Sequence, residues 1–272
     1  MERTITKGLH HVFLIILICF SAMVTALTDD FLSEKINEIK KQSELSQQID
    51  AFYLLKENHN LSDEQHARVL HLIAANMAKS GQLNEALTPL NQALALTKND
   101  AKKADIHRLI GLIYFYIDIP EAAIKYYSQS LIYQLSQNEQ VKAANLENNI
   151  ALAYEKMNQY ARALDYYQQA QPRYEEFGTE QDVLDIKLNR AGLLSKLGHN
   201  FEAISLYQTL IIDHSDVLDD NSLILAHSNL AVALNAVGQH KEAVSHLQSA
   251  KQLLLNQDDN YQLASVELNL AD

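Results

Sequence analysis

Asparagine recurs at one position along the chain, and its side chain suits the binding of a peptide backbone. The series has a spacing of 40 residues and consists of Asn149, Asn189, Asn229 and Asn269. A carboxamide carries a donor and an acceptor, so a row of carboxamides can pair with the backbone of an extended peptide whatever that peptide's sequence. The alternative is that each asparagine hydrogen-bonds a neighbouring helix and sets the spacing between repeats. The sequence leaves both roles open.

Four more polar residues are predicted to share a helical face with these asparagines. They are Asn145 and Lys156 beside the first asparagine, and Asp185 and Lys196 beside the second. Each lies four residues before or seven residues after its asparagine, which are helical spacings. These four residues and the first three asparagines are the candidate residues of a protein- or peptide-binding site.

No sequence pattern typical of a catalytic, cofactor or metal site is present. The chain lacks a glycine-rich phosphate loop and a nucleophile elbow, and its one cysteine lies near the amino terminus. His240 and His246 are six residues apart, and His66 and His71 are five apart. A helix places two rings on one face at separations of three or four, so neither pair is a typical zinc site. We therefore expect no enzyme activity, no cofactor and no metal ion.

Two series of small residues divide the chain into repeats that would position the asparagines. The first is Ala74, Gly111, Ala151, Ala191, Ala231 and Ala271, and the second is Ala86, Ala123, Ala163, Ala203 and Ala243. Successive members are 37 or 40 residues apart, and each member of the second series follows its partner by 12. Helix axes approach to about 8 Å only where side chains are small. Each repeat is therefore predicted to be a helical hairpin.

The residues between the two series predict a tight turn in each hairpin. They are Gly81, Asp118, Asn158, Gly198 and Gly238, types that tolerate the left-handed backbone conformation. Large residues four positions after the second series are predicted to fill the core: Leu90, Tyr127, Tyr167, Tyr207 and Leu247. Both helices of a repeat are amphipathic, and neither can bury its apolar stripe alone.

The segments NIALAYEKMNQYARALDYYQQA and NLAVALNAVGQHKEAVSHLQSA resemble tetratricopeptide repeats, and the resemblance covers roughly Ala67 to Asp272. A period of 40, against about 34 in the common form, is similar to the longer-repeat branch of bacterial regulators and kinesin light chains. The resemblance implies an all-α chain, a right-handed α-solenoid of tetratricopeptide-type helical hairpins. It also implies that the asparagine position faces a concave groove, where such proteins bind partner proteins.

The predicted domains are a leader, capping helices and the solenoid. Residues 27–62 are expected to form amino-terminal capping helices, and residues 63–272 the solenoid of five repeats plus the first helix of a sixth. The sequence Ser62-Asp63-Glu64-Gln65 is a capping box that places the start of the first repeat helix near Asp63. Pro89 is expected either to kink the second helix of that repeat or to delay its start.

Residues 1–26 have the pattern of a signal peptide. Arg3 and Lys7 precede the apolar run Val12 to Phe20, and Val24-Thr25-Ala26 carries short side chains where a signal peptidase cleaves. The run is shorter than the roughly 20 residues that a membrane-spanning helix needs. We expect Sec-dependent export, cleavage after Ala26 and a periplasmic or secreted protein. An uncleaved anchor, or a cytosolic scaffold in which this segment is not a leader, are the alternatives.

Charge and motif differences restrict the class of partner. The formal net charge of -12 makes nucleic acid a poor partner. Tetratricopeptide grooves that clamp acidic carboxyl-terminal tails use paired Lys or Arg, and the corresponding positions here hold Asp185 with Asn189 and Leu225 with Asn229. The expected partner is therefore a protein or an extended peptide segment of another kind. Membrane contact is expected only through an uncleaved leader or a missing carboxyl-terminal part.

Two functions remain open. The first is an exported scaffold that holds a partner segment in the concave groove. The second follows from Asn269-Leu270-Ala271-Asp272, which repeats the opening of another hairpin at the end of the sequence. In that interpretation the chain is the periplasmic sensory region of a longer membrane-bound diguanylate cyclase or histidine kinase.

Overall fold

The computed structural model describes residues 28–255, and every regular element in this range is an α-helix. The all-α prediction is thereby confirmed. The chain divides into two compact units, Met1–Ile117 and Asp118–Asp272. The predicted signal peptide, its cleavage point at Ala26, and the residues Asn269 to Asp272 lie outside the described residues.

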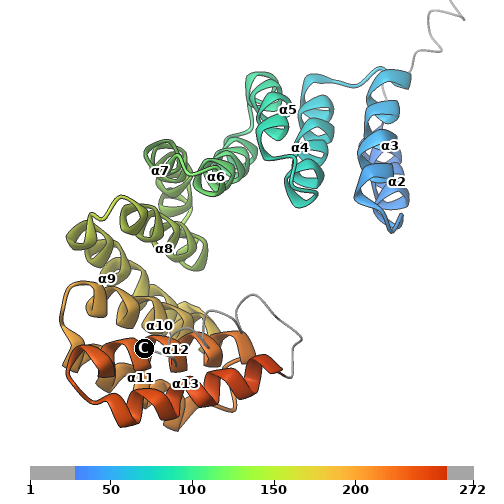
Figure 1. Ribbon diagram of the computed structural model, residues 1–272. Coiled ribbons are helices and arrows are strands. Elements are labelled where there is room, and N and C mark those ends of the chain that lie inside the picture. The colour runs from blue at the N-terminus through green and yellow to red at the C-terminus, as the bar shows by residue number, and fades with distance from the viewer. Residues whose placement is uncertain (1–27, 256–272) are drawn as a thin grey trace, which may run out of the picture. The chain divides into compact units, whose positions relative to one another are not determined.

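The described helices of the first unit pack in chain order (Figure 1). They are α2 (Asp29–Lys40), α3 (Leu45–Asn58), α4 (Asp63–Lys79), α5 (Leu83–Leu96) and α6 (Asp100–Tyr116). Each helix contacts the next, and α4 also contacts α6, the first helix of the following repeat.

The start of α4 confirms the capping box. The Ser62 hydroxyl accepts a hydrogen bond from the Gln65 backbone N–H, and the Gln65 side chain accepts one from the Ser62 backbone N–H. Pro89 lies inside α5, which already begins at Leu83, so the expectation of a late start is wrong. Proline removes one backbone donor from the helix. Its ring is buried in the hairpin, and this packing offsets the loss.

The second unit contains seven described helices. They are α7 (Pro120–Ser136), α8 (Gln140–Lys156), α9 (Tyr160–Phe177), α10 (Glu180–Lys196), α11 (Asn200–His214), α12 (Asp220–Ala236) and α13 (His240–Leu255). Each contacts the next, and α10 also contacts α12 (Figure 1). The helices α8, α10 and α12 are the first helices of three successive repeats.

The small and large residues of the repeat form the cores of the hairpins. Ala151 and Ala163 are fully buried and belong to one apolar cluster built by α8, α9 and α10. The large residues predicted to fill the core are also at most 1% exposed: Leu90, Tyr127, Tyr167, Tyr207 and Leu247. Pairing of the small residues across a helical hairpin is therefore confirmed in the second unit.

The turns adopt the predicted left-handed conformation. Positive φ angles occur at Gly81, Asp118, Asn158, Gly198 and Gly238. In the turn after α10, the Gly198 N–H donates to the Ser195 carbonyl and the His199 N–H donates to the Leu194 carbonyl. These bonds satisfy carbonyl groups that the end of a helix leaves without partners. Asn138 has the same conformation between α7 and α8, although no turn was predicted there from the repeat.

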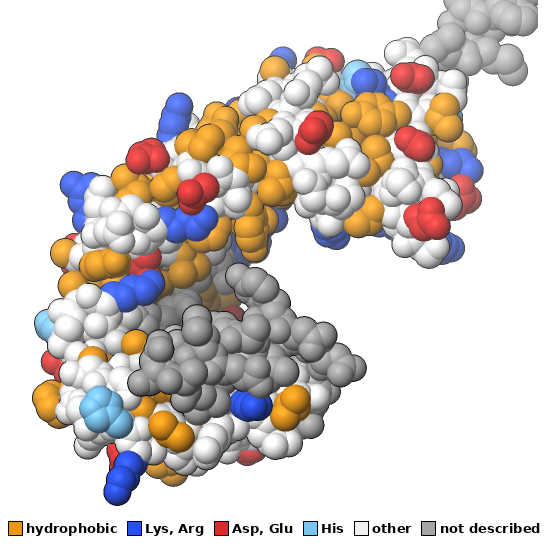
Figure 2. All heavy atoms as spheres, viewed as in Figure 1, with side chains coloured by type: hydrophobic (Ala, Val, Ile, Leu, Met, Phe, Trp, Pro, Cys, Tyr) orange, Lys and Arg blue, Asp and Glu red, His pale blue; other side chains and the backbone are white. Residues whose placement is uncertain are grey.

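The surface of the described residues is mixed in charge. On the face that Figure 2 shows, Lys and Arg side chains are interspersed with Asp and Glu side chains. None of the helices between residues 28 and 255 is both long enough and apolar enough to span a lipid bilayer.

Candidate peptide-binding site

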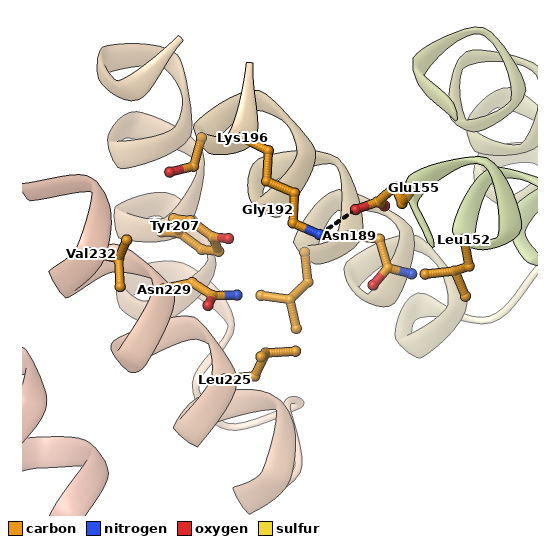
Figure 3. A pocket seen from close by; sticks show the side chains of 11 residues that line it. Leu152, Glu155, Asn189, Gly192, Lys196, Tyr207, Leu225, Asn229 and Val232 are labelled. Carbon is orange, nitrogen blue, oxygen red and sulfur yellow. Dashed lines mark hydrogen bonds and ion pairs between the residues drawn. The ribbon is translucent and has the colours of Figure 1, made fainter. Parts of the chain in front are cut away.

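A pocket of about 370 Å³ opens between the first helices of successive repeats in the second unit (Figure 3). Its walls come mainly from α8, α10 and α12, and one residue, Tyr207, comes from α11. This position is the expected one for a site built by the repeat, because the first helices present equivalent residues to the same space.

The pocket exists because one of the three repeats has a glycine where the other two have a large apolar side chain. Leu152, Gly192 and Val232 occupy the same repeat position, 40 residues apart, and all three line the pocket. A Cβ atom added at Gly192 would lie 3.3 Å from the Tyr207 hydroxyl oxygen and 3.9 Å from Asn229 Nδ2. Glycine in the middle repeat therefore leaves open the space in front of Tyr207 and Asn229.

Tyr207 brings a buried hydroxyl to this space. The residue is fully buried, and no group in the part of the chain that the structure describes accepts a hydrogen bond from its hydroxyl. Figure 3 shows the side chain pointing from α11 toward Gly192 and Asn229. Burial raises the pKa of Tyr207; the Asn229 amide, which approaches the phenol oxygen as a hydrogen-bond donor, offsets part of the rise, and the charge of Glu155 adds to it. The hydroxyl is therefore protonated and available as a donor.

The preceding repeat shows one way in which a tyrosine at this position is satisfied. The Tyr167 hydroxyl donates to Glu155 Oε1 at 2.5 Å. Forty residues later the glutamate is replaced by Ser195, whose hydroxyl donates to Asn200 Oδ1 at 3.3 Å instead. Tyr207 therefore lacks the carboxylate that its counterpart uses.

An ion pair borders the pocket. Lys196 Nζ on α10 lies 2.6 Å from Glu155 Oε2 on α8, and the side chains are 52% and 10% exposed. Glu155 also accepts the hydrogen bond from Tyr167 on α9. The carboxylate thus connects three helices, and it places a negative charge beside the pocket that Lys196 neutralises.

The structure separates the members of the asparagine series. Asn189 and Asn229 line the pocket, whereas the half-buried Asn149 does not. Asn189 Nδ2 donates to Asn148 Oδ1 on α8 at 3.0 Å, so this residue does bond a neighbouring helix. Among residues 28–255, that bond leaves its second amide hydrogen and its carbonyl oxygen without a partner. Asn269 lies outside the described residues.

The other candidate residues make contacts within the repeats. Asn145 accepts a hydrogen bond from the Tyr174 hydroxyl at 2.8 Å, and Lys156 pairs with Asp118 at 3.1 Å. Asp185 accepts from Gln181 at 2.8 Å, and its pKa is raised mainly by burial. None of these residues lines the pocket, and Lys196 is the only flanking candidate that does.

Gly192, Tyr207 and Glu155 line the pocket but were not among the candidate residues. One signal in the sequence could have identified them. Gly192 interrupts a column that is otherwise Leu152 and Val232, and Ser195 interrupts the Glu155 position in the same repeat.

Two histidines approach one another away from the pocket. His227 Nδ1 on α12 and His246 Nδ1 on α13 are 2.9 Å apart. Burial, followed by the proximity of His246, lowers the pKa of His227 to about 4. Among residues 28–255, no group of three or more His, Cys, Asp or Glu side chains is arranged to hold a metal ion.

Comparison with known proteins identifies the fold. The sequence matches the family of soluble NSF attachment proteins, SNAP, over residues 112–218, which is less than half of the chain. No curated protein matches it significantly. Among solved structures, the apo quorum sensor NprR of B. thuringiensis has a TM-score of 0.72 at 15% identity, covering 96% of this chain and 76% of that one.

Two further structures extend this likeness. A putative kinesin light chain of Podosopora anserina with TPR-like repeats has a TM-score of 0.59 at 19% identity, covering 70% of this chain and 95% of that one. The chain described in this structure is a tetratricopeptide-type α-solenoid. Aspartyl phosphate phosphatase F of Bacillus subtilis shares the solenoid fold, with a TM-score of 0.66 at 16% identity, covering 84% of this chain and 60% of that one. At these identities the likeness concerns the fold.

Proposed function

We propose that this solenoid is a non-catalytic interaction scaffold that binds an extended segment of a partner protein along α8, α10 and α12. The observation that carries the proposal is the pocket between these helices, where Asn189 and Asn229 lie at equivalent positions of adjacent repeats. Equivalent positions on stacked helices repeat the same polar group along one direction. An extended peptide likewise repeats its backbone donors and acceptors along one direction.

Apolar side chains on the same face support binding of a protein segment. Leu225 is 45% exposed and Val232 is 54% exposed, and both line the pocket. Concave sites that combine apolar walls with a few polar groups are typical of ligand-binding surfaces. The net charge of -12 opposes a nucleic-acid partner, because such a partner would be repelled by the overall field.

A pull-down that compares variants tests this function. Asn189→Ala combined with Asn229→Ala removes two pocket carboxamides, and Gln168→Ala removes an exposed carboxamide from α9 as the matched control. We expect the wild type and Gln168→Ala to retain the same partners from a periplasmic extract, and the double variant to lose them. Identical partners for all three proteins would show that binding does not use this face.

The site of action is proposed to be the periplasm or the exterior of the cell. The support is the leader pattern of residues 1–26, with a charged start, a short apolar run and small residues before Ala26. Sequencing the amino terminus of the mature protein tests it. Export predicts a chain that begins at Leu27, whereas a chain that begins at Met1 and fractionates with the cytosol would contradict it.

A further inference from the structure

The strongest unassigned feature is the Tyr207 hydroxyl, which faces the pocket and has no acceptor for its proton among the described residues. A buried hydroxyl that gives up water without gaining a hydrogen bond destabilises the folded chain. Groups of this kind are uncommon in folded proteins and call for an explanation. Here the hydroxyl lies beside a cavity, so a ligand that enters the cavity can accept its hydrogen bond.

Two changes in a single repeat create this arrangement. Ser195 replaces the glutamate that satisfies Tyr167 one repeat earlier, and Gly192 removes the side chain that would fill the space. Either change alone would leave a filled pocket or a satisfied hydroxyl. Together they leave a donor directed into an open cavity (Figure 3).

The groups around the cavity define the ligand chemistry. The Tyr207 hydroxyl donates, and the Asn229 amide nitrogen lies within 4 Å of the same point in front of Gly192. On the α8 side, the Glu155 carboxylate accepts hydrogen bonds, and each of its oxygens can accept more than one. Leu188 and Leu225 provide apolar walls between the polar groups. The pocket therefore offers donors and an acceptor between apolar walls.

Resting on the proposed function, we propose that this pocket binds the carboxamide side chain of a glutamine or asparagine in the bound peptide. The carbonyl oxygen of the carboxamide accepts from Tyr207 and Asn229. Its amide group donates toward Glu155, and its methylene groups contact Leu188 and Leu225. A carboxamide matches both kinds of polar group without bringing a charge into the cavity.

Other side chains fit less well for stated reasons. A carboxylate would be repelled by Glu155 and by the net charge of -12, and Lys196 is already paired with Glu155 at 2.6 Å. A cationic side chain would face the donors of Tyr207 and Asn229 and the ammonium group of Lys196. An apolar side chain would leave the Tyr207 hydroxyl without a partner. Discrimination of this type is strong when a site is built to hydrogen-bond its ligand.

The test uses the full chain and a library of random short peptides displayed on phage. We expect the selected peptides to be enriched in Gln or Asn at one position. For one selected peptide, replacing that residue by Met keeps a similar length but removes the carboxamide, and replacing it by Glu adds a charge. Both replacements are expected to weaken binding about tenfold, the effect of losing one or two buried hydrogen bonds.

Tyr207→Phe provides the matched protein variant, because it removes the hydroxyl and keeps the ring. Its thermal stability should be close to that of the wild type, since the hydroxyl proton has no protein acceptor to lose. We expect it to lose the preference for Gln over Met while still binding the Met peptide. Gly192→Ala, which narrows the cavity, should weaken the Gln peptide as well.

Failure of this inference and failure of the proposed function give different results. Peptides that need Asn189 and Asn229 but show no Gln or Asn enrichment would overturn the carboxamide pocket alone. An unchanged preference for Gln over Met in Tyr207→Phe would do the same. Selected peptides that bind equally well to the Asn189→Ala, Asn229→Ala double variant would overturn both.

Discussion

Glu147 places a carboxylate in the core of the α8–α9 hairpin, where only 1% of the residue remains exposed. Arg173 on α9 donates through Nε to both carboxylate oxygens, at 3.3 and 3.2 Å. Burial raises the pKa of Glu147, and Arg173 counteracts the rise through its charge and its hydrogen bonds. The buried carboxylate is therefore held by an ion pair between the two helices of the hairpin.

Removing one member of this pair should destabilise the chain far more than removing both. Arg173→Leu leaves Glu147 buried without a counter-charge, and we expect a loss of about 3 kcal/mol in the free energy of unfolding. Glu147→Leu combined with Arg173→Leu should recover most of this loss. Urea denaturation of the three proteins measures the effect. A double variant that is less stable than Arg173→Leu would contradict the account.

The pair of His227 and His246 predicts a loss of stability in acid. Both pKa values are lowered in the folded chain, that of His227 to about 4 from 6.5, so the unfolded chain binds more protons between these pH values. The free energy of unfolding therefore falls as the pH decreases through this window. For His227 the loss is on the order of 2 kcal/mol between about pH 7 and about pH 5.

Urea denaturation at the two pH values checks this prediction, with one test variant and one control variant. His227→Gln should reduce the pH dependence because glutamine does not titrate. His240→Gln replaces an exposed histidine and should leave the dependence unchanged. Equal pH dependence in the wild type and His227→Gln would show that the pair does not control acid stability.

At the scale of the elements, close packing of small residues holds each hairpin together. Ala163 on α9 is fully buried in the cluster that contains Ala151 on α8. Ala163→Leu inserts three carbon atoms into this contact, and we expect it to destabilise the chain by about 2 kcal/mol. Ala161→Leu on the exposed side of the same helix is the control. Thermal melts that fall equally for both variants would mean that Ala163 is not a close contact.

The hairpins could be predicted from the sequence because local chemistry determines them. Gly198 and Asn158 tolerate positive φ, and Ser62 with Gln65 caps a helix, whatever the rest of the molecule does. The behaviour of Pro89 could not be predicted in the same way. Burial of its ring, which only the packed hairpin provides, decides whether the helix continues.

At the scale of the whole molecule, the chain consists of two compact units, and the pocket belongs entirely to the second. The repeat period alone gave no reason to expect a division between Ile117 and Asp118. The residue series continues through this point with Gly111 and Ala123, so the boundary depends on packing between helices rather than on the pattern itself.

The candidate site could be predicted only in part. Asn189 and Asn229 line one pocket because equivalent positions on stacked helices share an environment, which the repeat spacing indicates. Repeat spacing could not show that Tyr174 donates a hydrogen bond to Asn145 or that Asp118 pairs with Lys156. Those partners come from other helices and turns. The pocket itself depends on the absence of a side chain at Gly192, which the repeat marks as an exception in its column, but only the packing around it shows that a cavity results.

Site-specific crosslinking tests most directly whether the partner lies along α8, α10 and α12. A photoreactive amino acid is placed at position 232 or at position 168. Val232 lines the pocket and is exposed to solvent, whereas Gln168 lies on the exposed surface of α9. Binding along α8, α10 and α12 predicts a crosslink to the partner from position 232 and none from position 168. A crosslink from position 168 without one from position 232 would contradict it.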